Sequence, residues 1–301
     1  MARQTPFSKR VAHPAQSGAT PRQAGQNNDC MPLEPLLILE LAVLGIGTGF
    51  LAGLLGIGGG MVLVPFLTLI LSQRGVPADL AVKMAIATSM ATIIFTSISS
   101  VRAHHRRGAV RWDLVRGLAP GIVIGSIIAS LGVFALLKGS WLALIFGVFV
   151  VFSATQMFRN KKPAPSRSMP GMGGQLGAGG FIGFLSGLVG AGGGFISVPF
   201  MAWCNVPMHN AVATSAALGF PIALSNVVGY VISGLSAQGL PPASFGYIWL
   251  PGLVIIAVAS VLTAPMGAKA AHALPVARLK KIFASMLYLL AVYMLAKGIA
   301  G

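Results

Sequence analysis

Between residues 35 and 301 the chain is a series of apolar tracts, most of them as long as a membrane span. A helix needs about 20 mainly apolar residues to cross the hydrocarbon core, so these tracts suffice for about eight to ten membrane-inserted segments. Charged residues make up only 9% of the chain, far below the roughly one quarter found in soluble domains. The sequence therefore predicts an all-α polytopic membrane protein.

Residues 1–34 differ from the rest in being polar and rich in Gln, Pro, Ala and Arg. They lack the apolar core of a signal peptide, so we expect a disordered tail. Beyond the tail, the helical segments expected in the first half of the chain are 35–56, 61–73, 79–101, 113–138 and 141–159. Those expected in the second half are 175–190, 195–205, 210–234, 247–268 and 281–299.

The two halves contain copies of one glycine-rich unit. Residues 49–66 (GFLAGLLGIGGGMVLVPF) align without gaps on residues 183–200 (GFLSGLVGAGGGFISVPF), and 12 of the 18 positions are identical. Self-similarity at a long, fixed spacing indicates duplication of a structural unit. We therefore expect a first transmembrane repeat at 35–160, a basic linker at 161–174 and a second repeat at 175–301.

The basic residues between the tracts predict the topology. They cluster at 102–111, 159–167 and 269–281, whereas 235–246 contains no Lys or Arg. Basic loops stay in the cytoplasm, so each half must cross the membrane an odd number of times and the halves become inverted repeats, as in many secondary transporters. This scheme puts the N-terminus outside although the tail is itself basic, so the absolute orientation stays open.

The glycine triplets at residues 58–60 and 192–194 predict a broken or re-entrant helix in each repeat. Glycine costs about 1 kcal/mol in a helix relative to alanine, and Pro65 and Pro199 follow five residues after the triplets. A helix that restarts after such a break presents free N–H groups and the positive end of its dipole, which together attract anions. We expect Gly58, Gly59, Gly60, Gly192, Gly193 and Gly194 to bind substrate, with Pro65 and Pro199 as structural helix breaks. Close helix packing through GxxxG spacing is the alternative.

Polar residues downstream of each triplet are further candidates for substrate binding. Lys83 and His209 each stand five residues before a Thr-Ser pair, and the candidates are Lys83, His209, Thr88, Ser89, Thr214, Ser215 and Asn226. The basic residues could instead lie at the membrane interface, and the hydroxyls could bond only to their own helix. Ser89, Thr92, Thr96, Ser99, Arg102 and Arg106 share one face of the expected helix and could line a polar path.

The charges narrow the class of substrate. Only five acids accompany 21 Lys and Arg, and cation transporters and proton relays ordinarily carry Asp or Glu within their spans. An anionic or neutral substrate is therefore favoured. The basic residues lie mostly between spans, which argues against nucleic-acid binding. We expect no metal site and no cofactor, since the paired histidines at 104–105 lack Cys or acidic partners.

The two glycine-rich copies, each with its following proline, and the segment HNAVATS at 209–215 resemble the TauE/SafE family of sulfite exporters over residues 36–299. The resemblance implies transport, mostly export, of sulfite, sulfonates or related sulfur-containing anions across the bacterial inner membrane. In the family pattern, substrate-site residues fall on the glycine triplets, His209 and the Thr-Ser pairs, and Lys83 stands where the second half has His209.

Two other functions stay open. One is an intramembrane serine hydrolase with Ser186 as nucleophile and His209 or His272 as base, although the first-half counterpart of Ser186 is Ala52. The other is a membrane subunit that does not transport. The absence of a P-loop motif argues against intrinsic ATP-driven pumping.

Overall fold

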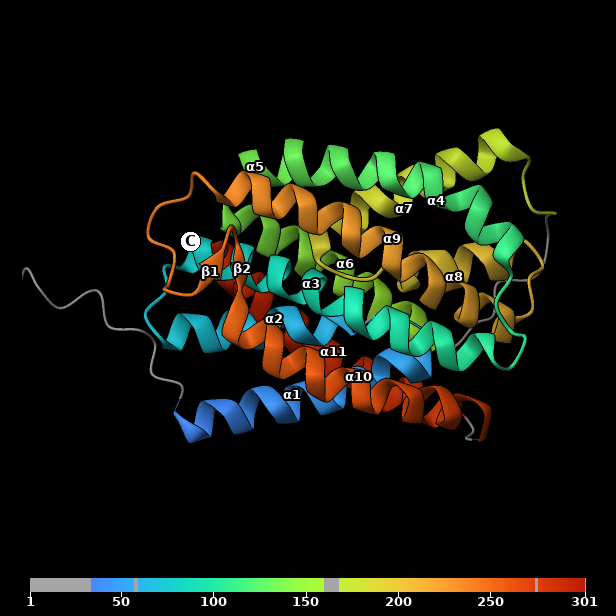
Figure 1. Ribbon diagram of the computed structural model, residues 1–301, viewed down its shortest axis with the longest axis horizontal. Helices are drawn as coiled ribbons and strands as arrows, with labels where there is room; N and C mark the ends of the chain where they lie inside the picture. Colours follow the sequence, from blue (N-terminus) through green and yellow to red (C-terminus); the bar gives the residue numbers. More distant parts are fainter. Residues whose placement is uncertain (1–33, 57–58, 160–167, 274–275, 301) are drawn as a thin grey trace, which may run out of the picture.

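The computed structural model describes residues 34–56, 59–159, 168–273 and 276–300, without the side chains of 271–280, and the described chain is almost entirely helical (Figure 1). Residues 1–33 of the tail predicted at 1–34 and residues 161–167 of the basic linker predicted at 161–174 lie outside these ranges. The helices of the described chain are α1 (Pro35–Leu55), α2 (Gly60–Gln73), α3 (Ala78–His105), α4 (Trp112–Ile127), η1 (Ile128–Val133), α5 (Phe134–Leu136), α6 (Gly139–Arg159), α7 (Met172–Val189), α8 (Gly194–Trp203), α9 (Met208–Gly234), α10 (Leu250–Ala273) and α11 (Val276–Ala300).

Eight of the described segments are long and apolar enough to cross a membrane, which confirms the polytopic all-α prediction. α3 and α9 are the most buried of them and pack against each other at the centre. Three further pairs surround this core, namely α1 with α10, α4 with α7, and α6 with α11. Each outer pair exposes apolar side chains on its outer face, as lipid contact requires.

Glycine seams hold two of the outer pairs together. Gly45, Gly49 and Gly53 of α1 lie directly against the backbone of α10, and a Cβ at any of them would come within 3.0 Å of that backbone. Gly179 and Gly183 of α7 meet α4 in the same way. The GxxxG spacing upstream of each glycine triplet therefore serves close packing.

The first two helices of each half form a helical hairpin. Arg74 Nη2, just after α2, lies 3.3 Å from Glu34 Oε2, just before α1. The start of α1 and the end of α2 therefore lie at the same end of the bundle. In the second half Met169, before α7, packs in the same cluster as Met201 and Val206 at the end of α8. Each pair is followed by three long segments, which are α3, α4–η1–α5 and α6 in the first half and α9, α10 and α11 in the second.

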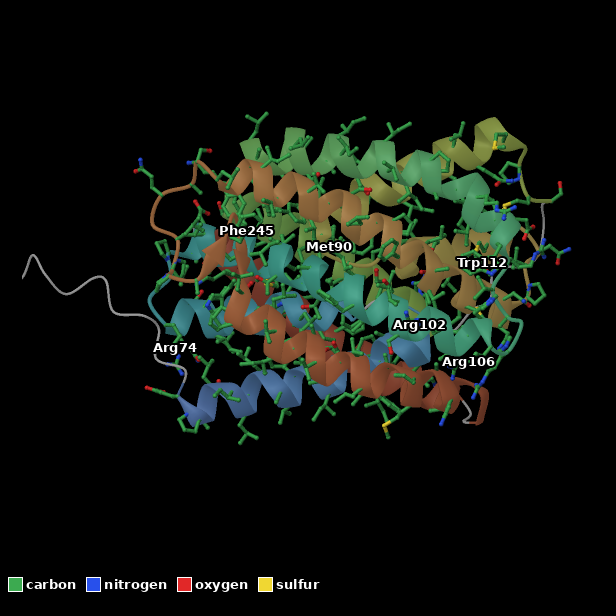
Figure 2. All side chains as sticks on the ribbon, in the orientation of Figure 1. Arg74, Met90, Arg102, Arg106, Trp112 and Phe245 are labelled. Carbon is green, nitrogen blue, oxygen red and sulfur yellow. The ribbon has the colours of Figure 1, made fainter. Side chains whose placement is uncertain are left out.

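The basic residues after α3 and those at the end of α10 lie at the same end of the bundle. Figure 2 shows Arg102, Arg106 and Trp112 at this end and Arg74 and Phe245 at the other. Arg107 Nη1 donates to Ala268 O at 3.2 Å, which brings the basic end of α10 to the same place. This arrangement agrees with a common cytoplasmic face for the basic loops. The inverted-repeat relation of the halves stays a prediction.

Several expected segments differ from the structure, among them α11, which begins at Val276 and not at 281, and α3, which ends at His105 and not at 101. The helix expected at 113–138 widens into the π-helix η1, a local change of winding that a 3.6-residue hydrophobic period does not reveal. The helix expected from residue 247 begins only at Leu250. Before it, β1 (Ser244–Phe245) pairs antiparallel with β2 (Ile248–Trp249), a hairpin turned by Gly246 at φ 56°.

Candidate functional site

Each helical hairpin, α1–α2 and α7–α8, is broken at glycines inside the bundle. α1 ends at Leu55, Gly56 follows in the left-handed conformation with φ 66°, and α2 restarts at Gly60 after Gly59 with φ 70°. The second half repeats this geometry with Gly190 at φ 70° and Gly193 at φ 73°, before α8 starts at Gly194. Side chains strongly disfavour such φ values, so the glycines are required by the backbone path. Gly58 lies outside the described residues.

The two prolines do not make the breaks. Pro65 and Pro199 lie inside α2 and α8, each five residues beyond the first residue of its helix. The structural-break role expected for them is therefore wrong, because the positive-φ glycines already end one helix and start the next. A proline this deep removes one helical hydrogen bond but leaves the helix continuous here.

Each break is bound by the central helix of the other half. Ser89 Oγ of α3 donates to Gly190 O at 3.3 Å, and Ser215 Oγ of α9 donates to Gly56 O at 3.0 Å. Both serines are fully buried. The helix-terminal carbonyls that would otherwise lack partners are thus satisfied across the boundary between the halves.

The two breaks also touch each other. A Cβ placed on Gly60 would come within 3.0 Å of Gly190 O and at 3.1 Å from both Ala191 Cα and Ser89 Oγ. The start of α2 therefore lies against the end of α7 with no room for a side chain. This contact brings the glycine-rich breaks of the two halves together at the centre of the bundle.

The threonines of the Thr-Ser pairs hold the two loops that lead into α4 and α10. Trp249 N, before α10, donates to Thr88 Oγ1 at 3.0 Å, and Arg111 N, before α4, donates to Thr214 Oγ1 at 3.0 Å. Both threonines are fully buried. Arg111, which lies just before the span, donates two hydrogen bonds to the Asp113 carboxylate, and this interaction raises the pKa of the guanidinium.

Lys83 and His209 lie away from the breaks. Lys83 Nζ donates to Ala135 O at 3.4 Å and stands 5.5 Å from the centre of the Tyr247 ring, beside α5 and the hairpin. His209 is exposed, in the first turn of α9. The two side chains are therefore not brought together in one site.

A polar cluster borders the second break. Asn226 Nδ2 donates to Ile222 O, whereas Asn226 Oδ1, Ser186 Oγ and Ser126 Oγ are buried without a hydrogen-bond partner among the described residues. All three lie next to glycines of α7 or of the break that follows it: Asn226 faces Gly187, Ser126 faces Gly183, and Ser186 faces Gly193. Unpaired buried oxygens are costly and are often explained by an absent ligand or water.

The polar face expected along α3 divides in two. Thr92 and Thr96 are buried and donate to α3 carbonyls one turn back. Ser99 donates instead to Val261 O of α10, and Arg102 and Arg106 are exposed. Thr92 and Thr96 are thus buried and bonded within α3, whereas Arg102 and Arg106, which share their face of the helix, are exposed. The polar path along this face stays a prediction.

The surroundings of the breaks contain no acidic side chain from the described part of the chain. All four acids in the described part of the chain, Glu34, Glu40, Asp79 and Asp113, are exposed. The helix starts at Gly60 and Gly194 contribute unsatisfied N–H groups and positive dipole ends near the centre. This environment suits negative charge better than positive charge.

The pairing required for a serine hydrolase with His209 is not present. Ser186 lies near Gly193 and one residue before Gly187, which faces Asn226. Asn226 stands 17 residues along α9 from His209, which is about 25 Å of helix. His272 lies among the residues whose side chains are not described.

Sequence reasoning missed two buried residues near the breaks. Ser197 Oγ of α8 donates to Ser215 Oγ at 2.8 Å, extending the bond to Gly56 O. Trp249 is only 1% exposed and its Nε1 has no partner among the described residues. The first-half counterpart of Ser197 is Leu63, so the repeat itself gave no signal for it.

Comparisons with known proteins agree with this architecture. The family model for the sulfite exporter TauE/SafE matches residues 41–294. A protein described as a "probable membrane transporter protein" from Haemophilus influenzae is 37% identical over 262 residues, covering 86% of this chain and 98% of that protein. A protein with the same description from Methanocaldococcus jannaschii is 26% identical over 271 residues, covering 88% of this chain and 98% of that protein. No solved structure matches.

The family match covers most of the chain, and both relatives align over nearly their whole length. Together with the membrane-spanning helices, it identifies a multi-pass membrane protein of a transporter family. The chain belongs to the TauE/SafE sulfite exporter family.

Proposed function

We propose that this protein is a secondary transporter that exports small sulfur-containing anions, such as sulfite or organosulfonates, across the bacterial inner membrane. The observation that carries the proposal is the meeting of two helix breaks at the centre of the bundle, where Gly60 lies against Gly190. Two helix starts near one point provide N–H groups and positive dipole ends for one anion. The family name supplies the sulfur chemistry.

The hydroxyls around the second break would complete the site. Ser126 and Ser186 carry unpaired O–H groups that can donate to the oxygens of a sulfite or sulfonate group. Ser89 and Ser215 bond to break carbonyls in this closed arrangement and could turn toward a bound anion. The first half has Ala52 where the second has Ser186, so the two breaks would contribute unequally.

We also propose that the two halves are inverted repeats that rock about this site. Three matched contacts support the relation. Ser89–Gly190 matches Ser215–Gly56, Trp249–Thr88 matches Arg111–Thr214, and the approach of His104 Nε2 to Gly53 O at 3.3 Å matches the bond from Tyr230 OH to Gly187 O. The first two pairs cross between the halves, so a relative movement of the halves would break both together.

The membrane potential would supply the driving force. An inside-negative potential favours exit of a monoanion by about 2.3 kcal/mol per 100 mV, roughly fifty-fold in concentration. No coupling ion is then required, which fits the exposure of every acid in the described chain. Sulfite flux from proteoliposomes should rise with an imposed potential of the matching sign. Flux that follows a pH gradient and ignores the potential would contradict this mechanism.

The test of the site itself uses Gly59→Leu and Gly193→Leu. Both glycines have φ near +70°, where a leucine is strained whatever the space around it. We expect each variant to insert in the membrane and to lose most sulfite and sulfonate flux. If both variants transport as the wild type does, the breaks only pack. If neither wild type nor variants move any sulfur anion, the substrate class is wrong.

A further inference from the structure

A groove with a volume of 380 Å³ lies between α3 and α10, away from the helix breaks. It is lined by Phe95, Ile98, Ser99, Arg102, Ala103, Arg106, Val261 and Pro265. Beside it on α10, Leu262 is 70% exposed and Met266 is 60% exposed, so the groove opens among side chains that face the lipid. The groove is thus accessible from the membrane.

The hydrogen bond from Ser99 Oγ to Val261 O, at 2.9 Å, ties the two walls together. Behind it on α3, Thr96 is buried and donates to Thr92 O. The lining of the groove includes no residue of the helix breaks and none of the serines proposed to bind the transported anion, so the groove is a separate site.

One end of the groove is strongly basic. Arg102 and Arg106 are one helical turn apart on α3, both are exposed, and neither guanidinium has an ion-pair or hydrogen-bond partner among the described residues. Figure 2 shows both at the end of the bundle that also carries Trp112, a residue type enriched at membrane interfaces. Two adjacent, unpaired guanidinium groups at this level suit a phosphate.

The length of the groove matches one leaflet of a bilayer. Phe95 and Arg106 are 11 residues apart on α3, which corresponds to about 16 Å along the helix. Half of the hydrocarbon core is about 15 Å thick. From Arg106 toward Phe95 the lining changes from guanidinium to apolar side chains, the order in which a phospholipid presents its head group and its acyl chain.

We propose that this groove binds one anionic phospholipid, with its phosphate on Arg102 and Arg106 and an acyl chain along Phe95, Ile98 and Val261. A small anion would meet the arginines but would leave the apolar length of the groove uncovered. The basic character of this end also places it at the leaflet where anionic lipids attract basic residues. The occupant is therefore a lipid rather than the transported anion.

The test measures the affinity of the full-length protein for phosphatidylglycerol and phosphatidylcholine in detergent, by native mass spectrometry and thermal stabilisation. The wild type should prefer phosphatidylglycerol. Arg102→Ala with Arg106→Ala should bind it roughly thirty-fold more weakly, from about 1 kcal/mol for each basic residue near a charged surface. Arg116→Ala with Arg159→Ala is the matched control, because these exposed arginines lie on α4 and α6 outside the groove, and it should bind as the wild type does.

Ile98→Trp keeps both arginines and fills the apolar part of the groove, so it should also weaken phosphatidylglycerol binding. Equal binding of the two lipids by the wild type, or equal loss in the groove variants and in the control, would overturn the proposal. It would also be overturned if sulfite or inorganic phosphate displaced phosphatidylglycerol and still bound the Ile98→Trp variant fully, since the groove would then hold a small anion.

Discussion

The contact between the two helix breaks can be tested with a single methyl group. Gly60→Ala adds a Cβ within 3.0 Å of Gly190 O and at 3.1 Å from Ala191 Cα. Both are backbone atoms of the opposite break, so neither can rotate away as the end of a side chain could. The added methyl must push the two breaks apart.

The expected cost follows from this geometry. Overpacking a well-packed interior costs about 1–3 kcal/mol. If the conducting arrangement needs the two breaks in contact, its population falls by about 5- to 150-fold. We therefore expect Gly60→Ala to lower both the thermal midpoint and the sulfite flux per inserted protein.

Gly47→Ala is the matched control in the same repeat. Gly47 lies in α1, and a Cβ there would meet nothing within 4 Å. Alanine is the better helix former by about 1 kcal/mol, so this variant should be at least as stable as the wild type and should transport normally.

The assay compares melting in detergent and flux in proteoliposomes for the two variants and the wild type. The reasoning is refuted if Gly60→Ala melts and transports as Gly47→Ala does. A Gly60→Ala protein of normal stability but without flux would still support the contact, because the added methyl would then act on the transport cycle alone.

The remaining predictions concern hydrogen bonds. Ser215→Ala leaves Gly56 O and Ser197 Oγ without their buried partner, which should cost about 1–3 kcal/mol and lower the melting temperature, whereas Ser285→Ala, at an exposed hydroxyl bonded to its own helix, should change little. Asp79 Oδ1 accepts from Ser140 N at the start of α6, so Asp79→Ala should destabilise by about 1 kcal/mol and Asp79→Asn should retain most of the stability. Equal melting temperatures for the alanine and asparagine variants would argue against this capping role.

The helix breaks were predictable because their cause is local. Three adjacent glycines inside an apolar tract disfavour a helix wherever the tract folds, and the structure breaks α1–α2 and α7–α8 at these positions. The prolines were misread, since a proline in the second turn is compatible with a continuous helix when the surrounding packing holds it.

The partners of the breaks could not be predicted, because they come from the opposite half of the chain. Ser89 and Gly190 are about 100 residues apart, and no local pattern records their contact. Lys83 and His209 stand at the same distance before their Thr-Ser pairs in the sequence. This equivalence does not bring the two side chains into one site. α3 starts after Pro77 and α9 after Pro207, so Lys83 lies in the second turn of its helix and His209 in the first.

The seam between α1 and α10 has a consequence for biosynthesis. Gly45 packs against Ile256, so α1 must wait after its synthesis for a partner that is made about 210 residues later. At 5–20 residues per second this wait lasts roughly 10 to 40 s. During that time the glycine face of α1 is open to lipid or to a chaperone. A nascent chain stalled before α10 should therefore be degraded faster than one stalled after it.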